Sequence, residues 1–126
     1  MKEDDVRSVL INPNIATIQT DTRFADRVYL LPISVTYVQK VIEKERPDSI
    51  MLGFGGQTAL NCGVALEDKE ILRKYGIRVL GTQIEGIKIT EDRQLFKEAM
   101  QKSDIPVLPS APAYSLAEAK KIAKEI

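Results

Sequence analysis

The sequence predicts an α/β fold built on an open, doubly wound and mostly parallel sheet. Short apolar runs alternate along the 126 residues with segments of helical spacing. Strands that alternate with helices need crossover connections, which pair the strands in parallel and place the helices on the sheet. The hydrophobic content of 44% is sufficient for a core in a chain of this length.

The strands are indicated by short apolar and β-branched runs, each stopped by a turn-forming residue. The first run stops at Asn12-Pro13, the second at Pro32 and the third at Gly53. Proline cannot donate a ladder hydrogen bond and glycine permits a sharp turn, so strand pairing is expected to end at these residues. The four expected strands span residues 8–12, 28–31, 49–52 and 78–80.

Helical spacing fills the intervals between and after these strands. From Val35 onward apolar residues recur three and four positions apart, and Ser34 is available as the N-cap. Ser115 and Glu118 form a capping box at the start of the last helix. The expected helical segments are residues 35–45, 57–66, 67–75, 84–89, 91–100 and 115–126, and the fifth has two acids in its first turn.

Composition excludes several classes of function. Eighteen basic and 18 acidic side chains give a formal net charge of zero, which argues against nucleic acid or an anionic membrane as the main partner. The absence of histidine excludes Ser-His-Asp and Cys-His catalysis and any zinc site containing histidine. Cys62 is the single cysteine, so no internal disulfide forms and a reducing compartment is expected. Its side chain is either a small buried group or a reactive thiol.

Neither a membrane-spanning segment nor a secretory signal is expected. The longest apolar runs are too short to cross a bilayer. The N-terminal segment is acidic at residues 3–5, whereas a secretory signal begins with basic and then apolar residues. Export is therefore not expected.

The turn that follows the third strand is the most informative candidate site, because ligands of such sheets bind beyond the carboxyl ends of the strands. Gly55 and Gly56 allow a sharp turn and a close approach of the backbone, and the helix that follows begins with amides that favour an anion. Gln57, Thr58 and Asn61 add neutral donors and acceptors. The segment matches neither the Walker nor the dinucleotide pattern, so a ligand-facing turn and a packing turn both remain open.

Two other segments each have a purely structural interpretation and a functional one. The polar turn at residues 12–17 either caps itself locally or faces a ligand. Arg93 is expected in the first turn of a helix, where a cation opposes the helix dipole. Its guanidinium therefore either pairs with Glu91 or Asp92 or contacts a phosphate or ribose hydroxyl of a ligand.

Taken together, the motifs resemble the large chain of carbamoyl phosphate synthetase over almost the whole sequence. The Gly-Gly-Gln-Thr-Ala-Leu-Asn run at residues 55–61 resembles the first half of that chain, which makes carboxyphosphate; the second half typically has proline where this chain has Ala59. The segments that match, in the family's order, are residues 8–20, 25–26, 43–48, 55–63, 75–76, 79–82 and 91–93.

The resemblance implies a fold and site residues. Residues 1–89 would form a partial pre-ATP-grasp α/β domain of Rossmann-like type, and residues 90–126 would begin the ATP-grasp region with a helix, a proline-rich loop and a helix. Arg93 matches a nucleotide contact of the family. Gly55, Gly56, Gln57, Thr58 and Asn61 match the motif that faces the active-site cleft. No residue of the chain is implied as catalytic or as a metal ligand.

The resemblance also implies an activity and partners. The family makes carbamoyl phosphate from bicarbonate, ammonia derived from glutamine and two ATP, with Mg²⁺ or Mn²⁺ at each nucleotide, for arginine or pyrimidine biosynthesis. The expected partners are the remainder of the large chain and a glutamine amidotransferase subunit or domain. Relatives are cytoplasmic or, in some eukaryotes, mitochondrial.

Two departures from the family pattern shape the expectation for this chain. No strand with a Gly-Ala-Gly-Pro-like turn precedes Ser8, so the sheet is expected to lack its first, central strand. The metal-binding acids and most ATP contacts of the family have no counterpart here, so the isolated chain is expected to be inactive. A noncatalytic α/β binding or assembly module is the alternative, whereas a nicotinamide dehydrogenase domain lacks its three-glycine fingerprint.

Overall fold

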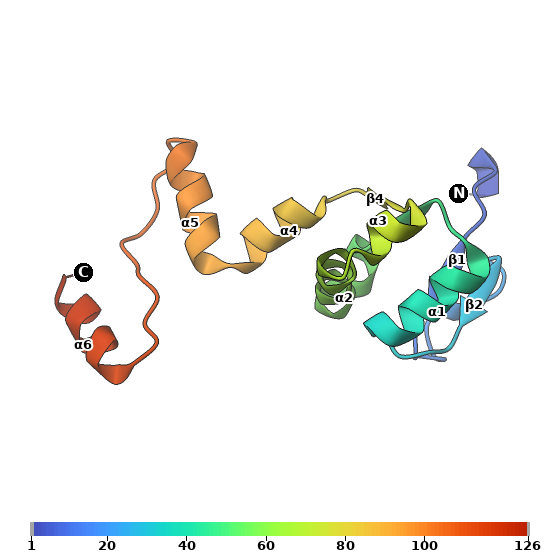
Figure 1. Cartoon of the computed structure of the whole chain (residues 1–126), viewed down its shortest axis with the longest axis horizontal. Helices are drawn as coiled ribbons and strands as arrows, with labels where there is room; N and C mark the ends of the chain where they lie inside the picture. Colours follow the sequence, from blue (N-terminus) through green and yellow to red (C-terminus); the bar gives the residue numbers. More distant parts are fainter. Residues whose placement is uncertain (1, 126) are drawn as a thin grey trace. The chain divides into compact units, whose positions relative to one another are not determined.

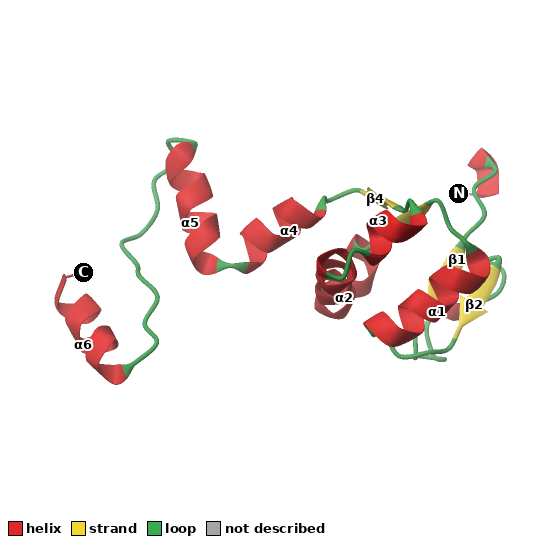
Figure 2. Ribbon diagram, in the orientation of Figure 1, coloured by secondary structure: helices red, strands yellow, loops and turns green. Residues whose placement is uncertain are grey.

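The computed structural model describes residues 2–125, and the chain divides into two compact units, one ending at Thr82 and the other beginning at Gln83 (Figure 1). The first unit holds all the strands of the described residues, whereas the second consists of helices and loops (Figure 2). The α/β class predicted from the sequence is confirmed for the first unit.

Four short strands form two parallel pairs in the first unit. In one pair Leu10 lies opposite Val28, and in the other Ile50 lies opposite Val79. Within the described residues the two pairs are separate two-stranded sheets, where the sequence predicted one open sheet. The strands are β1 (Val9–Ile11), paired with β2 (Arg27–Tyr29), and β3 (Ser49–Met51), paired with β4 (Arg78–Leu80).

Three α-helices accompany these strands, and their ends follow from backbone geometry. Ser34 occupies the N-cap position of the first helix as predicted, but its hydroxyl makes no capping hydrogen bond. The predicted single segment of residues 67–75 is divided, because Glu70 adopts a left-handed conformation with φ 55°. The helices are α1 (Val35–Glu45), α2 (Gly56–Asp68) and α3 (Ile71–Tyr75), with 3₁₀ turns η1 (Lys2–Asp4), η2 (Ile18–Thr20) and η3 (Gly53–Gly55).

The buried residues of the first unit lie on its three α-helices and on residues that flank the strands. Leu66 and Leu72 are 0% and 2% exposed. Gly63 is a point of close contact, since a Cβ built there would lie 2.2 Å from Leu52 Cδ1. The other buried apolar residues of this unit are Ala25, Val38, Val41, Ile42, Leu52, Cys62, Ile71 and Ile77.

Two tyrosines connect α1 to its neighbours. The Tyr29 hydroxyl of β2 donates to Glu45, and the Tyr75 hydroxyl of α3 donates to Glu43 over 2.8 Å. The Arg46 guanidinium lies over the Tyr75 ring at 4.9 Å from its centroid. These contacts join the end of α1 to both β2 and α3.

The second unit contains α4 (Ile84–Glu91), α5 (Arg93–Lys102) and α6 (Leu116–Glu125). The prediction that Glu91 and Asp92 lie in the first turn of one helix is wrong. Instead α4 continues to Glu91, and the Asp92 amide donates to the Lys88 carbonyl over 3.2 Å. The Thr90 hydroxyl donates to the carbonyls of Gly86 and Ile87 within this helix. Asp92 is extended (φ −97°, ψ 118°) and separates α4 from α5.

The capping box predicted at the start of α6 forms in part. Ser115 Oγ accepts a hydrogen bond from the Glu118 amide over 3.2 Å. The Glu118 carboxylate accepts from the amide of Tyr114, one residue before the expected donor, over 2.8 Å. None of the described helices has the length and apolar character needed to cross a membrane.

Candidate functional site

The turn between β3 and α2 has the sharp backbone geometry that its glycines predict. The chain leaves β3 at Met51, forms η3, and enters α2 at Gly56. Gly56 has φ 59° and ψ −160°, a conformation that residues with a side chain rarely adopt. The backbone at Gly56 therefore requires glycine, whether or not a ligand is bound.

Gly55 is needed for a different reason. A Cβ at this position would lie 2.3 Å from the Cβ of Ala59, which is closer than real Cβ atoms come. The missing side chain lets the turn lie directly against the first turn of α2. Gly55 thus has a packing role, whereas Gly56 is required by its backbone conformation, and both residues are exposed.

The polar residues at the start of α2 form an exposed neutral surface. Gln57, Thr58 and Asn61 are all exposed, and the Gln57 Nε2 amide donates to Asn61 Oδ1 over 3.0 Å. The first turn of α2 contains no acidic residue. The positive end of the helix dipole is therefore not neutralised by its own first turn, an arrangement suited to an anionic or phosphate-bearing ligand.

The polar turn after β1 is satisfied by its own side chains. Asn12 Oδ1 accepts from the Asn14 amide and Asn14 Oδ1 accepts from the Ala16 amide, each over 2.9 Å. The Thr17 hydroxyl accepts from the Gln19 amide over 3.4 Å. These bonds support the local-capping interpretation of residues 12–17.

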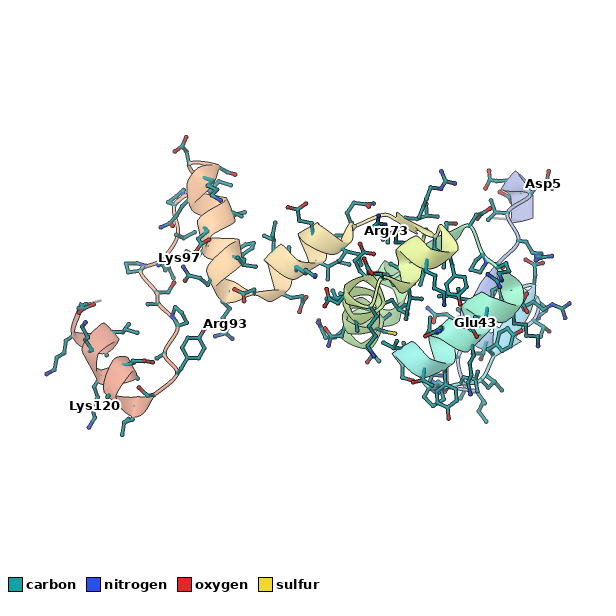
Figure 3. The ribbon with its side chains drawn as sticks, viewed as in Figure 1. Asp5, Glu43, Arg73, Arg93, Lys97 and Lys120 are labelled. Atoms are coloured by element: carbon teal, nitrogen blue, oxygen red, sulfur yellow. The ribbon has the colours of Figure 1, made fainter. Side chains whose placement is uncertain are left out.

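Arg93 occupies the first position of α5, with an exposed side chain (Figure 3). Of the alternatives that the sequence left open, pairing of Arg93 with Asp92 does not occur. Asp92 Oδ1 instead accepts from the amides of Gln94 and Leu95, over 2.8 and 2.9 Å. Within residues 2–125 the Arg93 guanidinium has no hydrogen-bond or ion-pair partner, so all its donors are available to a ligand.

The candidate residues fall into two groups. Gly55, Gly56, Gln57, Thr58 and Asn61 lie together in the first unit, at the carboxyl end of β3. Arg93 belongs to the second unit. Each group is locally exposed and chemically suited to phosphate groups.

Ionisable side chains elsewhere show ordinary structural roles. The Arg23 guanidinium donates to both Asp21 carboxylate oxygens, which lowers the pKa of Asp21. Burial raises the pKa of the Cys62 thiol. The thiol is thus held in its protonated form, in agreement with the small buried group rather than the reactive thiol.

An apolar cleft beside β2 was not predicted. Its lining residues are Ile15, Thr20, Thr22, Val28 and Leu30. A partial signal was present in the sequence, because Ile15 lies in the polar turn at residues 12–17; Ile18 follows in η2 and does not line the cleft. Both are largely exposed, at 75% and 71%.

Comparison with known proteins extends these observations. Residues 1–89 match the model of the carbamoyl phosphate synthase pre-ATP-grasp domain. The carbamoyl phosphate synthase large chain of Hyperthermus butylicus is 56% identical over 126 residues, all of this chain and 12% of that protein. The multifunctional protein CAD of Squalus acanthias is 53% identical over 126 residues, which are 6% of its length.

A solved structure supports the fold at greater evolutionary distance. The biotin carboxylase domain of a thermophilic 2-oxoglutarate carboxylase, bound to bicarbonate, superposes with a TM-score of 0.63 at 22% identity. The alignment covers 99% of this chain and 29% of that one. The resemblance inferred from the sequence motifs is confirmed, and the chain belongs to the carbamoyl phosphate synthase large-chain family, with its pre-ATP-grasp domain at residues 1–89.

Proposed function

We propose that this chain is part of a carbamoyl phosphate synthase large chain and frames the site that forms carboxyphosphate from bicarbonate and ATP. The observation that carries the proposal is the exposed turn at residues 55–61, at the carboxyl end of β3, in a chain 56% identical to such a large chain over its full length. The complete enzyme would join bicarbonate, ammonia from glutamine and two ATP into carbamoyl phosphate, for arginine or pyrimidine synthesis.

ATP is the cofactor that the exposed groups fit best. Arg93 offers a guanidinium with no protein partner among the described residues, and such a group can bind a phosphate or a ribose hydroxyl. The start of α2 offers neutral donors at Gln57, Thr58 and Asn61, beside a helix N-terminus. We assign Arg93 to the nucleotide and residues 55–58 and 61 to the active-site cleft.

The divalent metal of the reaction would be held by other parts of the large chain. Among the described residues there is no group of three or more side chains suited to bind a metal ion. Magnesium or manganese would neutralise charge on the phosphates. The contribution of this chain would be to position and shape the site, and the isolated chain would not turn over.

The two strand pairs support the proposal that one further strand completes the sheet. Each pair is parallel and contains only two strands, and a two-stranded sheet is marginal by itself. A strand between β1 and β3 would join β1–β2 and β3–β4 into one sheet. We propose that this strand is supplied by another part of the large chain.

The same proposal sets the domain limits, the partners and the location. Residues 1–89 would be the pre-ATP-grasp domain and 90–126 the start of the ATP-grasp region. The chain spans 12% of the large chain from Hyperthermus butylicus. The partners would be the rest of such a chain and a glutamine amidotransferase, with neither nucleic acid nor membrane, in the cytoplasm or, for some eukaryotic relatives, the mitochondrion.

The isolated chain provides the first test. With ATP, bicarbonate and Mg²⁺, we expect no phosphate release above that of buffer, because the metal ligands are proposed to lie elsewhere. Bicarbonate-dependent hydrolysis by this chain alone would contradict the proposed division of the site.

A chimeric enzyme tests the role of Arg93. The large chain of Hyperthermus butylicus would carry this chain in place of its matching 126 residues. Loss of charge-assisted hydrogen bonds worth about 1.5–3 kcal/mol predicts that Arg93→Ala raises the KM for ATP by roughly 10-fold or more in the bicarbonate-dependent reaction. Arg73→Ala is the matched control, because Arg73 is an exposed arginine near a helix end whose ion-pair partner among residues 2–125 is Glu70, at 3.6 Å (Figure 3).

The chimera also separates the proposed function from the alternative of a noncatalytic assembly module. The unpaired edges of the two strand pairs are the observation that favours that alternative. If the chimera turns over ATP and both Arg93→Ala and Arg73→Ala change the KM for ATP equally, the proposed contact between Arg93 and the nucleotide would be refuted. A chimera that assembles and remains inert would favour the assembly module.

A further inference from the structure

Residues 103–115 connect α5 to α6 and are here called the proline loop. Its two ends bond to the adjacent helices through the amides of Ile105 and Tyr114. Its centre, residues 106–113, contains three prolines, which have no amide hydrogen to donate. Among the described residues no backbone hydrogen bond joins this centre to another segment, so its position depends on side chains.

One side chain of α5 supplies a link to the centre of the proline loop. Lys97 Nζ donates a hydrogen bond to the backbone carbonyl of Ser110, which lies 13 positions further along the chain. An ammonium donor makes a stronger hydrogen bond than a neutral donor does. Lys97 therefore holds the proline loop against α5.

The link lies on the face of α5 that carries Arg93. Residues four positions apart on a helix are neighbours on one face, so Arg93 and Lys97 lie one above the other. The proline loop leaves the C-terminal end of α5 and returns along the helix to meet Lys97 at Ser110 (Figure 1). The loop then continues toward the start of α5, where Arg93 lies. The backbone that Lys97 holds is thus next to the face on which Arg93 would meet a ligand.

The acceptor that Lys97 uses leaves Arg93 available. It is a neutral carbonyl, so the bond brings no carboxylate close to Arg93. Glu98, the one acid of α5, accepts from Gln94 Nε2 over 2.8 Å, one position round the helix from Arg93 and Lys97. Neither cation has an ion-pair partner among the described residues. This face of α5 therefore keeps two positive charges, which suit phosphate groups.

We propose that Lys97 is a positioning residue of the nucleotide site, which holds the proline loop beside Arg93 before ATP binds. The nucleotide and its contact with Arg93 belong to the proposed function, on which this step rests. A loop that becomes ordered only on binding costs conformational entropy and weakens affinity, whereas a loop ordered beforehand does not. Loss of the Lys97 bond should therefore weaken ATP binding and leave the chemical step unchanged.

Three variants separate the loop contact from the charge of α5. Lys97→Met keeps an aliphatic stem at this half-buried position and removes the ammonium donor. Lys97→Arg restores a charged donor. Lys102→Met is the matched control, because it removes a cation from the same helix, at an exposed side chain with no hydrogen-bond or ion-pair partner among residues 2–125.

Nuclear magnetic resonance of this chain without nucleotide tests the contact itself. The measured quantity is the backbone order parameter of the non-proline amides at the centre of the proline loop. We expect values above about 0.6 in the unmodified chain, Lys97→Arg and Lys102→Met, and values below about 0.6 in Lys97→Met. Equal order parameters in all four chains, whether high or low, would overturn the proposal.

The chimeric large chain tests the consequence for ATP. Lys97→Met should raise the KM for ATP about three- to tenfold and leave kcat within about twofold, because one hydrogen bond that orders the loop is lost. Lys97→Arg and Lys102→Met should leave the KM within about twofold. A raised KM with unchanged order parameters would identify a direct contact between Lys97 and the nucleotide and overturn the positioning role. Loss of loop order without any rise in KM would overturn it as well.

Failure of this proposal and failure of the proposed function give different results. A chimera that is inert, or whose KM for ATP does not respond to Arg93→Ala, would refute the proposed function and with it the role of Lys97 toward ATP. The order parameters, measured without nucleotide, would still decide whether Lys97 holds the proline loop. An active chimera that responds to Arg93→Ala but not to Lys97→Met would refute the positioning role alone.

Discussion

The two units of this chain differ in what stabilises their helices. In the first, α1, α2 and α3 all contribute buried apolar side chains, and Leu66 has no exposed surface. In the second, α5 and α6 bury none among the described residues, and Ile87 of α4 is the one buried apolar side chain. Leu95 and Phe96 of α5 are each 43% exposed.

The difference shows that helix formation and core formation are separate in this sequence. Asp92 caps α5 through two backbone amides, and Ser115 caps α6 through one. Such caps favour a helix locally, but short helices are marginal in water without tertiary packing. The second unit therefore has the local signals of a folded region without a comparable core of its own.

Truncation of a core leucine should have the largest effect on the free energy of unfolding, and it tests the difference between the two units most directly. Leu66→Ala should lower the free energy of unfolding by about 2–5 kcal/mol, because it removes buried methyl groups and leaves a cavity. Urea unfolding followed by circular dichroism would measure the loss. Leu116→Ala, at a 73% exposed leucine that also lies in a helix, should change it by no more than about 0.5 kcal/mol. Equal losses in both variants would mean that the second unit has a core after all.

Removal of the α5 cap should have a smaller and more local effect. Asp92→Ala deletes the acceptor for the amides of Gln94 and Leu95, at a typical loss of about 0.5–2 kcal/mol. We expect faster hydrogen exchange at these two amides and little change in the first unit. Asp92→Asn should preserve most of the protection, since asparagine is also a good N-cap. Fast exchange in Asp92→Asn as well would show that the cap is not what holds α5.

The smallest expected effect concerns the pH dependence of the α1–α3 contact. The pKa of Glu43 is lowered from its ordinary value of 4.5, first by the Gln39 amide and then by the Tyr75 hydroxyl, which donate to its carboxylate over 2.9 and 2.8 Å. A lowered folded-state pKa stabilises the fold above pH 4.5, and this contribution is lost as the pH falls below it.

Thermal unfolding between pH 6 and pH 3 would measure this contribution. Glu43→Gln should reduce the acid-induced loss of stability slightly, because glutamine does not titrate, and should leave α5 and α6 unaffected. Because Glu43 is exposed, solvent screens much of the effect. An acid profile identical to that of the unmodified chain would show that the contact does not contribute.

The sequence predicted the regular elements of the first unit well, because each had both a periodic pattern and a stop signal. The strand at residues 78–80 agrees with β4, and α1 ends where Arg46 adopts φ 50° beside Pro47. The break at Glu70 was missed, since a non-glycine residue in a left-handed conformation gives no sequence signal. The boundary at Asp92 was also missed, because this residue follows α4 directly and its carboxylate caps α5, so that one charged run contains both a helix end and a helix start.

The geometry of the candidate site was only partly predictable from the sequence. The sharp turn at Gly55 and Gly56 followed from the glycines alone, and the structure adds that each is required by a separate steric constraint. Local geometry also decided that Asp92 caps α5 and does not pair with Arg93. The apolar cleft beside β2 had a partial signal in Ile15, but its full lining could not be predicted from any single segment, because the cleft forms only where the loop after β1 folds beside β2.

The buried cysteine described above gives the first unit an internal reporter of its own opening. Cys62 is the sole thiol, lies in the core beside Gly63, and is held protonated by burial. An alkylating reagent reacts with the thiolate form of cysteine. Because the Cys62 side chain is buried, the reagent reaches it only when α2 separates from its neighbours. The labelling rate would therefore follow the population of open molecules, and a segment that completes the sheet should slow it without any engineered probe.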